Sequence, residues 1–124
     1  MKIFLDTSLL SDSHLLTISK ELLDSQQSGN NTFYISAVTH FQLMWGYLTA
    51  GIPPDKYVTF LNKVQIEVAP LTKTDAENAA NFKPSRTDLL DALIASSAKR
   101  YNATVWTRDK DFLKFLPQNK IRIF

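Results

Sequence analysis

Residues 1–8, with the sequence MKIFLDTS, decide the expected fold. Ile3, Phe4 and Leu5 form an unbroken apolar run. Such a run is typical of a strand that is buried on both faces, in a parallel sheet covered by helices. The run ends in a carboxylate that is followed by two hydroxyl groups. Because ligands bind at the carboxyl ends of strands in open α/β sheets, this stretch predicts a functional acid at Asp6.

Length and composition limit the possible classes of protein. The chain has 124 residues, of which 44% are hydrophobic, so we expect a single domain over residues 1–124. No segment approaches the ~18 continuous apolar residues of a membrane span, and the first residues do not resemble a signal peptide. We therefore expect a cytoplasmic protein with no membrane contact. The chain has no cysteine, which excludes disulfides, thiolate zinc sites and Cys nucleophiles.

The formal net charge is only +2, but the basic residues are unevenly distributed. Nine of the 14 Lys and Arg residues lie at or after Lys83. A basic C-terminal third could attract phosphate groups. Solvated helix faces and a basic tail explain the same distribution equally well, so the charge leaves both interpretations open.

The expected strands and helices alternate along the chain. Apolar runs bounded by turn residues predict strands at 3–5, 32–35, 66–68, 103–106 and 121–124. Helical periodicity and capping residues predict helices at 14–27, 38–49, 55–62, 74–82 and 88–100. This alternation predicts an α/β fold, a three-layer α/β/α sandwich with a mostly parallel central sheet. Residues 66–68 are expected at the sheet edge, because Glu67 interrupts the run and Pro70 ends it.

Helix caps follow from the same sequence. Ser13 and Ser36 are suitable N-caps for the first two helices. Thr74 and Glu77 match a capping box for the fourth helix. Thr87 or Asp88 is expected to cap the fifth.

Three acids are expected at one rim of the sheet. Asp6 and Asp109 each follow a predicted strand, and Asp91 lies in the first turn of a helix. Three neighbouring carboxylates repel one another unless a cation neutralises them. Carboxylates without His or Cys favour a hard ion such as Mg²⁺ or Mn²⁺. Such a site supports phosphodiester hydrolysis, because the metal activates water and stabilises the developing charge.

Each acid also has a purely structural interpretation. Asp91 could only favour the helix N-terminus, although it shares the expected inner face of the helix with Leu90 and Ile94. Asp109 could cap the short helix that follows it, a role that Asp111 fills at least as well. Acids are common at helix starts, so both interpretations stay open for Asp91 and Asp109.

Other polar and aromatic residues carry weaker signals. Thr7, Ser8 and Thr107 could orient waters or phosphate oxygens, and local turn capping is the simpler explanation for Ser8. His14 and His40 lack the spacing of metal ligands. The chain has no Gly-rich phosphate loop and no dinucleotide-binding motif. Both tryptophans, Trp45 and Trp106, are expected in the core.

Four sequence blocks, in order, resemble the PIN domain family, and most closely the VapC-like toxin ribonucleases of bacterial toxin–antitoxin systems. The blocks are Leu5-Asp6-Thr7-Ser8, Ile35-Ser36-Ala37-Val38-Thr39 with Gln42, Leu90-Asp91-Ala92-Leu93-Ile94-Ala95, and Thr107-Arg108-Asp109-Lys110-Asp111-Phe112. Each block is weak individually, but four in order over nearly the whole chain are specific.

The resemblance implies a Mg²⁺- or Mn²⁺-dependent ribonuclease that acts on RNA, forms homodimers and binds a cognate antitoxin. Asp6, Asp91 and Asp109 match the acids of the family. Ser8, Thr107 and Arg108 would orient the substrate. The second acid of the family, usually Glu, is Gln42 in this chain. An amide keeps an oxygen that can bind a metal, but it has no charge and cannot act as a base.

Three functional hypotheses follow. The leading one is a metal-dependent endoribonuclease, the toxin of a toxin–antitoxin pair, with Gln42 in the catalytic site. The alternative is a catalytically impaired PIN-like module that binds RNA or a protein, which Gln42 favours. A receiver-like phosphate acceptor resembles the chain poorly, because no pair of acids precedes the Asp6 strand.

Overall fold

The computed structural model describes the backbone of residues 1–124 and all side chains except those of residues 12–17. One sheet has the strand order β3-β2-β1-β4-β5, and each neighbouring pair is parallel. The strands are β1 (Lys2–Leu5), β2 (Thr32–Ser36), β3 (Glu67–Ala69), β4 (Thr104–Thr107) and β5 (Ile121–Ile123). The five expected strands are confirmed, and β3 lies at an edge as predicted.

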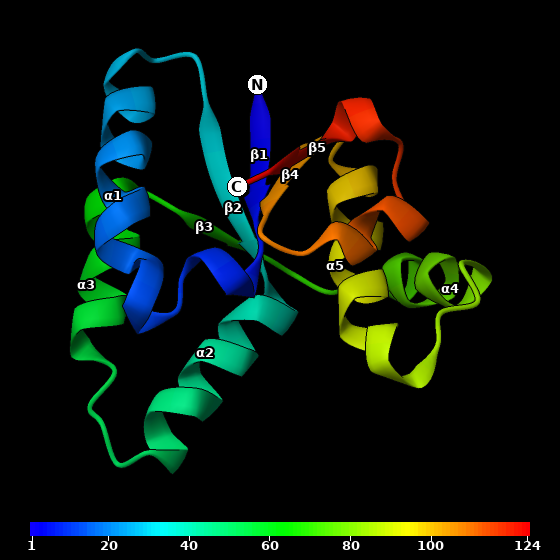
Figure 1. Ribbon diagram of the computed structural model, residues 1–124, viewed down its shortest axis with the longest axis horizontal. Coiled ribbons are helices and arrows are strands. Elements are labelled where there is room, and N and C mark those ends of the chain that lie inside the picture. The colour runs from blue at the N-terminus through cyan, green and yellow to red at the C-terminus, as the bar shows by residue number, and fades with distance from the viewer.

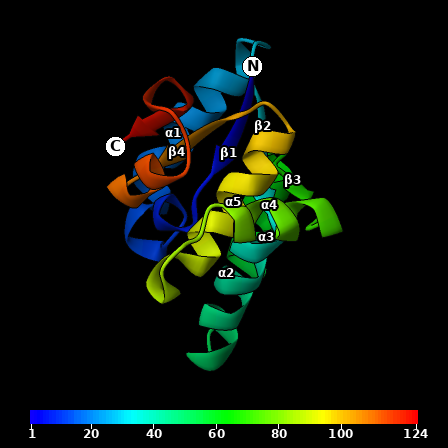
Figure 2. The same ribbon diagram turned by 90° about the vertical axis from the view of Figure 1, so that its right-hand side faces the viewer.

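Helices cover both faces of this sheet. They are α1 (Asp12–Gln27), α2 (Ala37–Thr49), α3 (Asp55–Val64), α4 (Lys73–Asn81) and α5 (Leu89–Arg100). Short 3-10 helices are η1 (Thr7–Leu9), η2 (Arg86–Asp88), η3 (Lys110–Lys114) and η4 (Gln118–Lys120). In Figure 1, α1 and α3 lie on one side of the sheet and α4 and α5 on the other, which confirms the three-layer α/β/α architecture. Helix α2 projects from the end of the sheet where the strands finish, as Figures 1 and 2 both show.

The central strand supplies both halves of the core. Ile3 and Leu5 belong to the cluster on the α1 and α3 side, and Phe4 belongs to the cluster on the α5 side. All three side chains are fully buried. Burying a side chain of this kind contributes about 1.5–3 kcal/mol. The unbroken apolar run therefore places β1 in the middle of the sheet and fixes where Asp6 emerges.

Of two helix caps predicted from the sequence, one is confirmed and the other is wrong. Ser36 accepts a hydrogen bond from the backbone of Thr39 at 3.0 Å, so the predicted cap of α2 is confirmed. The capping box of α4 is formed by Thr72 and Asp75, so the prediction of Thr74 and Glu77 is wrong.

The register of α4 is set by the buried carboxylate of Asp75. It receives the guanidinium of Arg100 at 2.8 Å and the hydroxyl of Ser97 at 3.0 Å, both from α5. This tertiary pairing fixes Asp75 as the acid of the box. The predicted cap at Ser13 and the interpretation of His14 concern side chains outside the described residues.

Expectations about burial were partly wrong. Trp106 is buried in the core as predicted, with its ring edge against Phe33. Trp45 is 60% exposed on α2, because the outer face of this helix has no covering element. Leu90 is also exposed, whereas Ile94 is buried as expected. No described helix combines the length and the apolar composition that crossing a membrane requires.

Candidate functional site

Asp6 is held rigidly at the carboxyl end of β1. Its backbone N–H donates to the carbonyl of Trp106 at 3.0 Å, which extends the pairing of β1 with β4 by one residue. Its side chain is 4% exposed, and Oδ2 accepts hydrogen bonds from the hydroxyls of Ser8 at 2.7 Å and Thr107 at 2.8 Å. Because both hydroxyls use Oδ2, the lone pairs of Oδ1 remain for another partner.

Thr107 connects two of the predicted site acids. It is fully buried at the end of β4, and its hydroxyl donates to Asp6 while accepting the backbone N–H of Asp109 at 2.9 Å. Asp109 in turn accepts the backbone N–H of Asp111 at 2.8 Å, so Asp109 caps η3. The alternative in which Asp111 supplies this cap is wrong. Asp109 combines its capping role with a place beside the other acids.

Asp91 is the point at which the three predicted acids meet. Burial raises the pKa of its carboxyl group to about 7, and the negative charges of Asp6 and then of Asp109 add to this effect. A hydrogen bond with the Asp109 side chain and the charge of Asp88 contribute further. A pKa so far above the ordinary value of 3.8 means that burial first, and the neighbouring negative charges second, disfavour the charged form of Asp91. The structure thus brings Asp6, Asp91 and Asp109 into one electrostatic group.

Two further acids, Asp88 and Asp111, extend this group and were not predicted as site residues. Carboxylate oxygens of Asp88, Asp91 and Asp111 lie within 4.8 Å of one another. Asp88 is at the N-cap position of α5, yet its side chain makes no cap hydrogen bond, so its expected capping role is wrong. It accepts instead from Ser85 at 2.7 Å and from Lys114 at 3.0 Å. Its spacing three residues before Asp91, on one helix face, was the available signal.

Lys114 forms ion pairs with two of these acids, Asp88 and Asp111. Its ammonium group lies 3.0 Å from Asp88 and 3.4 Å from Asp111, and the hydrogen bonds from Ser85 and Lys114 lower the pKa of Asp88. Among the residues with described side chains, no Lys or Arg forms an ion pair with Asp6, Asp91 or Asp109. Within the part of the chain whose side chains are described, the acids that meet within 4.8 Å are Asp88, Asp91 and Asp111, and the predicted set of Asp6, Asp91 and Asp109 is not such a group. A divalent cation at the predicted set would offset the negative charges of Asp6 and Asp109, which add to the effect of burial on the pKa of Asp91. Their role as metal ligands stays a prediction.

Gln42 reaches the same rim from the first half of α2. Its side-chain oxygen accepts the hydroxyl of Thr7 at 2.6 Å, and Thr7 directly follows Asp6. The hydroxyl oxygens of Thr7 and Thr39 are 3.2 Å apart, and Thr39 is fully buried. The hydrogen bonds of Thr7 therefore join the end of β1 to α2. The sequence signalled Gln42, but it did not reveal that Thr7 holds it.

The remaining predicted orienting residues lie at the same end of the sheet. Ser8 also accepts the backbone N–H of Arg108 at 3.1 Å, which connects η1 with the segment after β4. The Arg108 side chain is exposed. His40 is engaged with the hydroxyl of Tyr57 at 2.7 Å, in agreement with a structural role. Contact of Ser8, Thr107 or Arg108 with a substrate stays a prediction.

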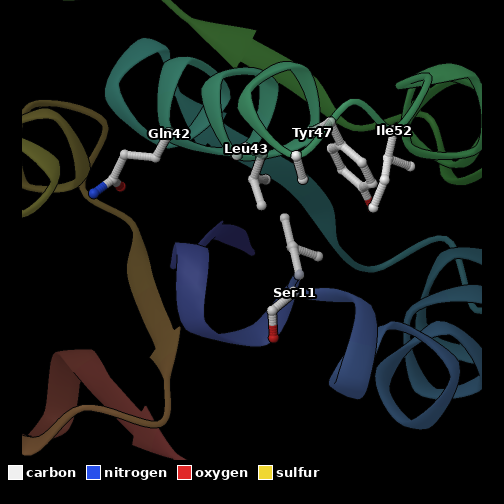
Figure 3. Close-up of a pocket in the computed structure, with 8 residues that line it drawn as sticks. Ser11, Gln42, Leu43, Tyr47 and Ile52 are labelled. Carbon is white, nitrogen blue, oxygen red and sulfur yellow. The ribbon is translucent and has the colours of Figure 1, made fainter.

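A hollow adjoins this site, and Gln42 is one of the residues that line it. It has a volume of about 240 Å³ and lies between the start of α1 and the face of α2 that carries Leu43 and Tyr47. Figure 3 shows that the amide of Gln42 points away from the hollow, whereas the side chains of Leu43, Tyr47 and Ile52 border it. The predicted acids do not line it. The hollow is therefore distinct from the acidic rim.

Solved structures with this fold come from several bacteria. VapBC2 from Rickettsia felis, bound to a DNA fragment from their promoter, has a TM-score of 0.71 and 21% identity over 99% of this chain and 98% of that chain. A toxin–antitoxin complex from Klebsiella pneumoniae has a TM-score of 0.68 and 18% identity, covering 97% of this chain and 95% of that chain. DNA-bound VapBC from Salmonella typhimurium has a TM-score of 0.64 and 20% identity, covering 100% and 97%. Because the sequence identities are this low, the structural similarity establishes a shared fold and nothing further.

Sequence comparison identifies the family. The chain matches none of the curated proteins. The family model described as the PIN domain matches residues 3–115, which is most of the 124 residues and includes every predicted acid. On this match and on the fold, the chain belongs to the PIN domain family.

Proposed function

We propose that this protein is a Mg²⁺- or Mn²⁺-dependent endoribonuclease that hydrolyses RNA phosphodiester bonds. The observation that carries the proposal is the raised pKa of Asp91, which burial and the charges of Asp6 and Asp109 together produce. Groups with strongly perturbed pKa values gather at functional sites. PIN domains in general are metal-dependent nucleases, and the donor set here consists of hard oxygen ligands suited to these ions.

Each residue of the site has a distinct task in this proposal. Asp6, Asp91 and Asp109 would hold the cation. When bound, a divalent cation activates water and balances the charge that develops on the phosphate. Ser8 and Thr107 orient the Asp6 carboxylate by donating to its Oδ2.

RNA cleavage tests the proposal. We expect the protein to cleave single-stranded RNA with Mg²⁺ or Mn²⁺ and to be inactive with a chelator. Asp6→Asn removes one ligand charge and should abolish cleavage. Asp24→Asn makes the same chemical change on the exposed face of α1 and serves as the matched control. Equal cleavage by the Asp6 variant and the wild type would remove Asp6 from the site.

A second candidate function rests on Gln42. Without a charge at this position the site has three predicted ligand carboxylates from Asp6, Asp91 and Asp109, and it lacks a Glu that could act as a base. In this alternative the protein binds RNA or a protein partner without cleaving RNA. Metal binding without cleavage, under conditions in which RNA is bound, would favour the alternative.

The biological setting that we propose is a cytoplasmic toxin with a cognate antitoxin. Similar structures come from VapBC assemblies and a toxin–antitoxin complex, which supports a protein partner. We also propose a homodimer. Helix α2 offers an uncovered apolar face for such contacts, since Phe41, Trp45 and Leu48 are 65%, 60% and 62% exposed.

Assembly can be tested on this face. Trp45→Ser removes the largest exposed apolar side chain of α2 without affecting the core. We expect the variant to keep the melting temperature of the monomer and to lose self-association or antitoxin binding in sedimentation experiments. If the variant kept both self-association and antitoxin binding, this face of α2 would be excluded as the contact surface.

A further inference from the structure

The side chain of Gln42 is fixed in a defined direction. The hydroxyl of Thr7 has one proton, and it is donated to the Gln42 carbonyl oxygen at 2.6 Å. Because the amide oxygen is bonded to Thr7, the NH₂ group is the end of the side chain that remains for another partner. Figure 3 shows the amide turned away from the hollow that Leu43 and Tyr47 line. The amide therefore lies at the end of the sheet where Asp6 lies, held there through its oxygen by Thr7.

The NH₂ group is available to a ligand. Among the described residues, none accepts a hydrogen bond from the Gln42 nitrogen, and no buried polar side-chain atom lacks a partner. The nitrogen thus reaches solvent. It carries two N–H donors and has no lone pair for a metal ion, so it can only meet an acceptor.

An uncharged donor such as the Gln42 amide suits an anionic acceptor better than a carboxylate would at this place. Carboxylates such as those of Asp6, Asp91 and Asp109 repel the phosphate groups of a nucleic acid strand. A Glu at position 42 would add to this repulsion, whereas an amide adds a donor without charge. The exposed Arg108 and Lys110 follow β4 at the same end of the sheet and favour an anion there.

We propose that Gln42 binds the substrate strand, with its NH₂ group donating to a phosphate oxygen and Thr7 fixing the direction of the amide. Gln42 is then neither a metal ligand nor a base. This inference rests on the proposed function, because it takes the bound polyanion to be RNA.

The experiment separates metal binding from RNA binding. Mn²⁺ affinity is measured by calorimetry without RNA. Affinity for a single-stranded RNA oligonucleotide is measured by fluorescence anisotropy in Ca²⁺. Gln42→Leu removes the donor at similar size, and we expect Mn²⁺ affinity within about twofold of wild type and RNA affinity about tenfold weaker or more, the scale of a hydrogen bond to a charged group. Gln118→Leu makes the same change at an exposed position of η4 and should alter neither value.

Further variants distinguish binding from a structural role. Gln42→Glu should bind Mn²⁺ more tightly and RNA more weakly, a pair of opposite changes that simple loss of packing does not produce. Thr7→Val should weaken RNA binding in the same direction as Gln42→Leu, and Thr7→Ser should restore it because the hydroxyl is kept. Melting temperatures of all variants identify any that are unfolded.

The possible failures are distinct. Equal RNA affinity of wild type and Gln42→Leu would overturn this inference and leave the proposed function intact. A tenfold loss of Mn²⁺ affinity in Gln42→Leu would make Gln42 a metal ligand and would also overturn it. A wild-type protein that binds Mn²⁺ but no RNA would refute the proposed function itself, and this inference with it.

Discussion

Replacing Asp91 by Asn should stabilise the metal-free protein at neutral and alkaline pH. The carboxyl group has a pKa of about 7 in the folded protein and an ordinary value of 3.8 in an unfolded chain. At a pH between these two pKa values, Asp91 holds a proton in the folded state and has lost it in the unfolded state. The free energy of unfolding therefore falls as pH rises from about 4 to about 7, and the full penalty is present above pH 7.

The size of this effect follows from the pKa difference. A rise in pKa of about three units corresponds to a free-energy difference of about 4 kcal/mol between the two protonation states. The Asp91 side chain is only partly buried, so solvent screening reduces this figure, and we expect about 2 kcal/mol. Asn keeps the shape of the neutral acid and carries no charge. Asp91→Asn should thus be about 2 kcal/mol more stable than wild type at pH 8, or roughly 6–12 °C in melting temperature, and nearly equal to it at pH 4.

Urea unfolding in a chelator at pH 4, 6 and 8 measures the difference. The matched control is Asp24→Asn, an exchange on the exposed surface of α1 that should change stability by no more than about 0.5 kcal/mol at any pH. Adding Mn²⁺ should reverse the order at pH 8, because only the wild type keeps the complete set of ligands. An Asp91→Asn protein that is less stable than wild type at pH 8 without metal, or that keeps the same dependence on pH, would refute the reasoning.

Three other predictions concern the same scaffold. Mn²⁺ affinity, followed by calorimetry, should fall by up to about tenfold per pH unit below pH 7, because the proton on Asp91 competes with the metal. Thr107→Val should weaken Mn²⁺ binding by about 10- to 100-fold, since it removes the hydrogen bond that orients Asp6, whereas Thr104→Val on the same strand should not. Asp75→Asn should lower the free energy of urea unfolding by about 3 kcal/mol, because Arg100 loses its partner, and the loss should shrink in the Arg100→Met background.

The sequence predicted the parts of the fold that depend on short-range patterns. The run Ile3 to Leu5 identified the central strand, because a strand buried on both faces must be apolar at consecutive positions. Ser36 was identifiable as a cap because its role depends on a residue only three positions later. The placement of Asp6 at the end of β1 followed directly from the strand boundary.

Predictions failed where a distant contact decides the outcome. The α4 capping box uses Asp75 because α5 supplies Arg100, a partner 25 residues away. The match between Thr74 and Glu77 was equally good locally, and nothing in the sequence of α4 distinguishes the two registers. Trp45 was expected in the core because large aromatic residues usually are, but burial depends on whether another element covers α2.

The acidic rim shows most clearly why composition alone does not define a site. Five carboxylates gather near the carboxyl ends of β1 and β4, and Asp91 belongs both to the group with Asp6 and Asp109 and to the group with Asp88 and Asp111. Lys114 separates the two groups, because its single charge lies within 3.4 Å of both Asp88 and Asp111. The short η3 helix brings Lys114 to that position, three residues after Asp111 and one turn away. On the side of Asp6, the hydroxyl groups of Ser8 and Thr107 hold the carboxylate in place, and we expect a cation from solution to bind there.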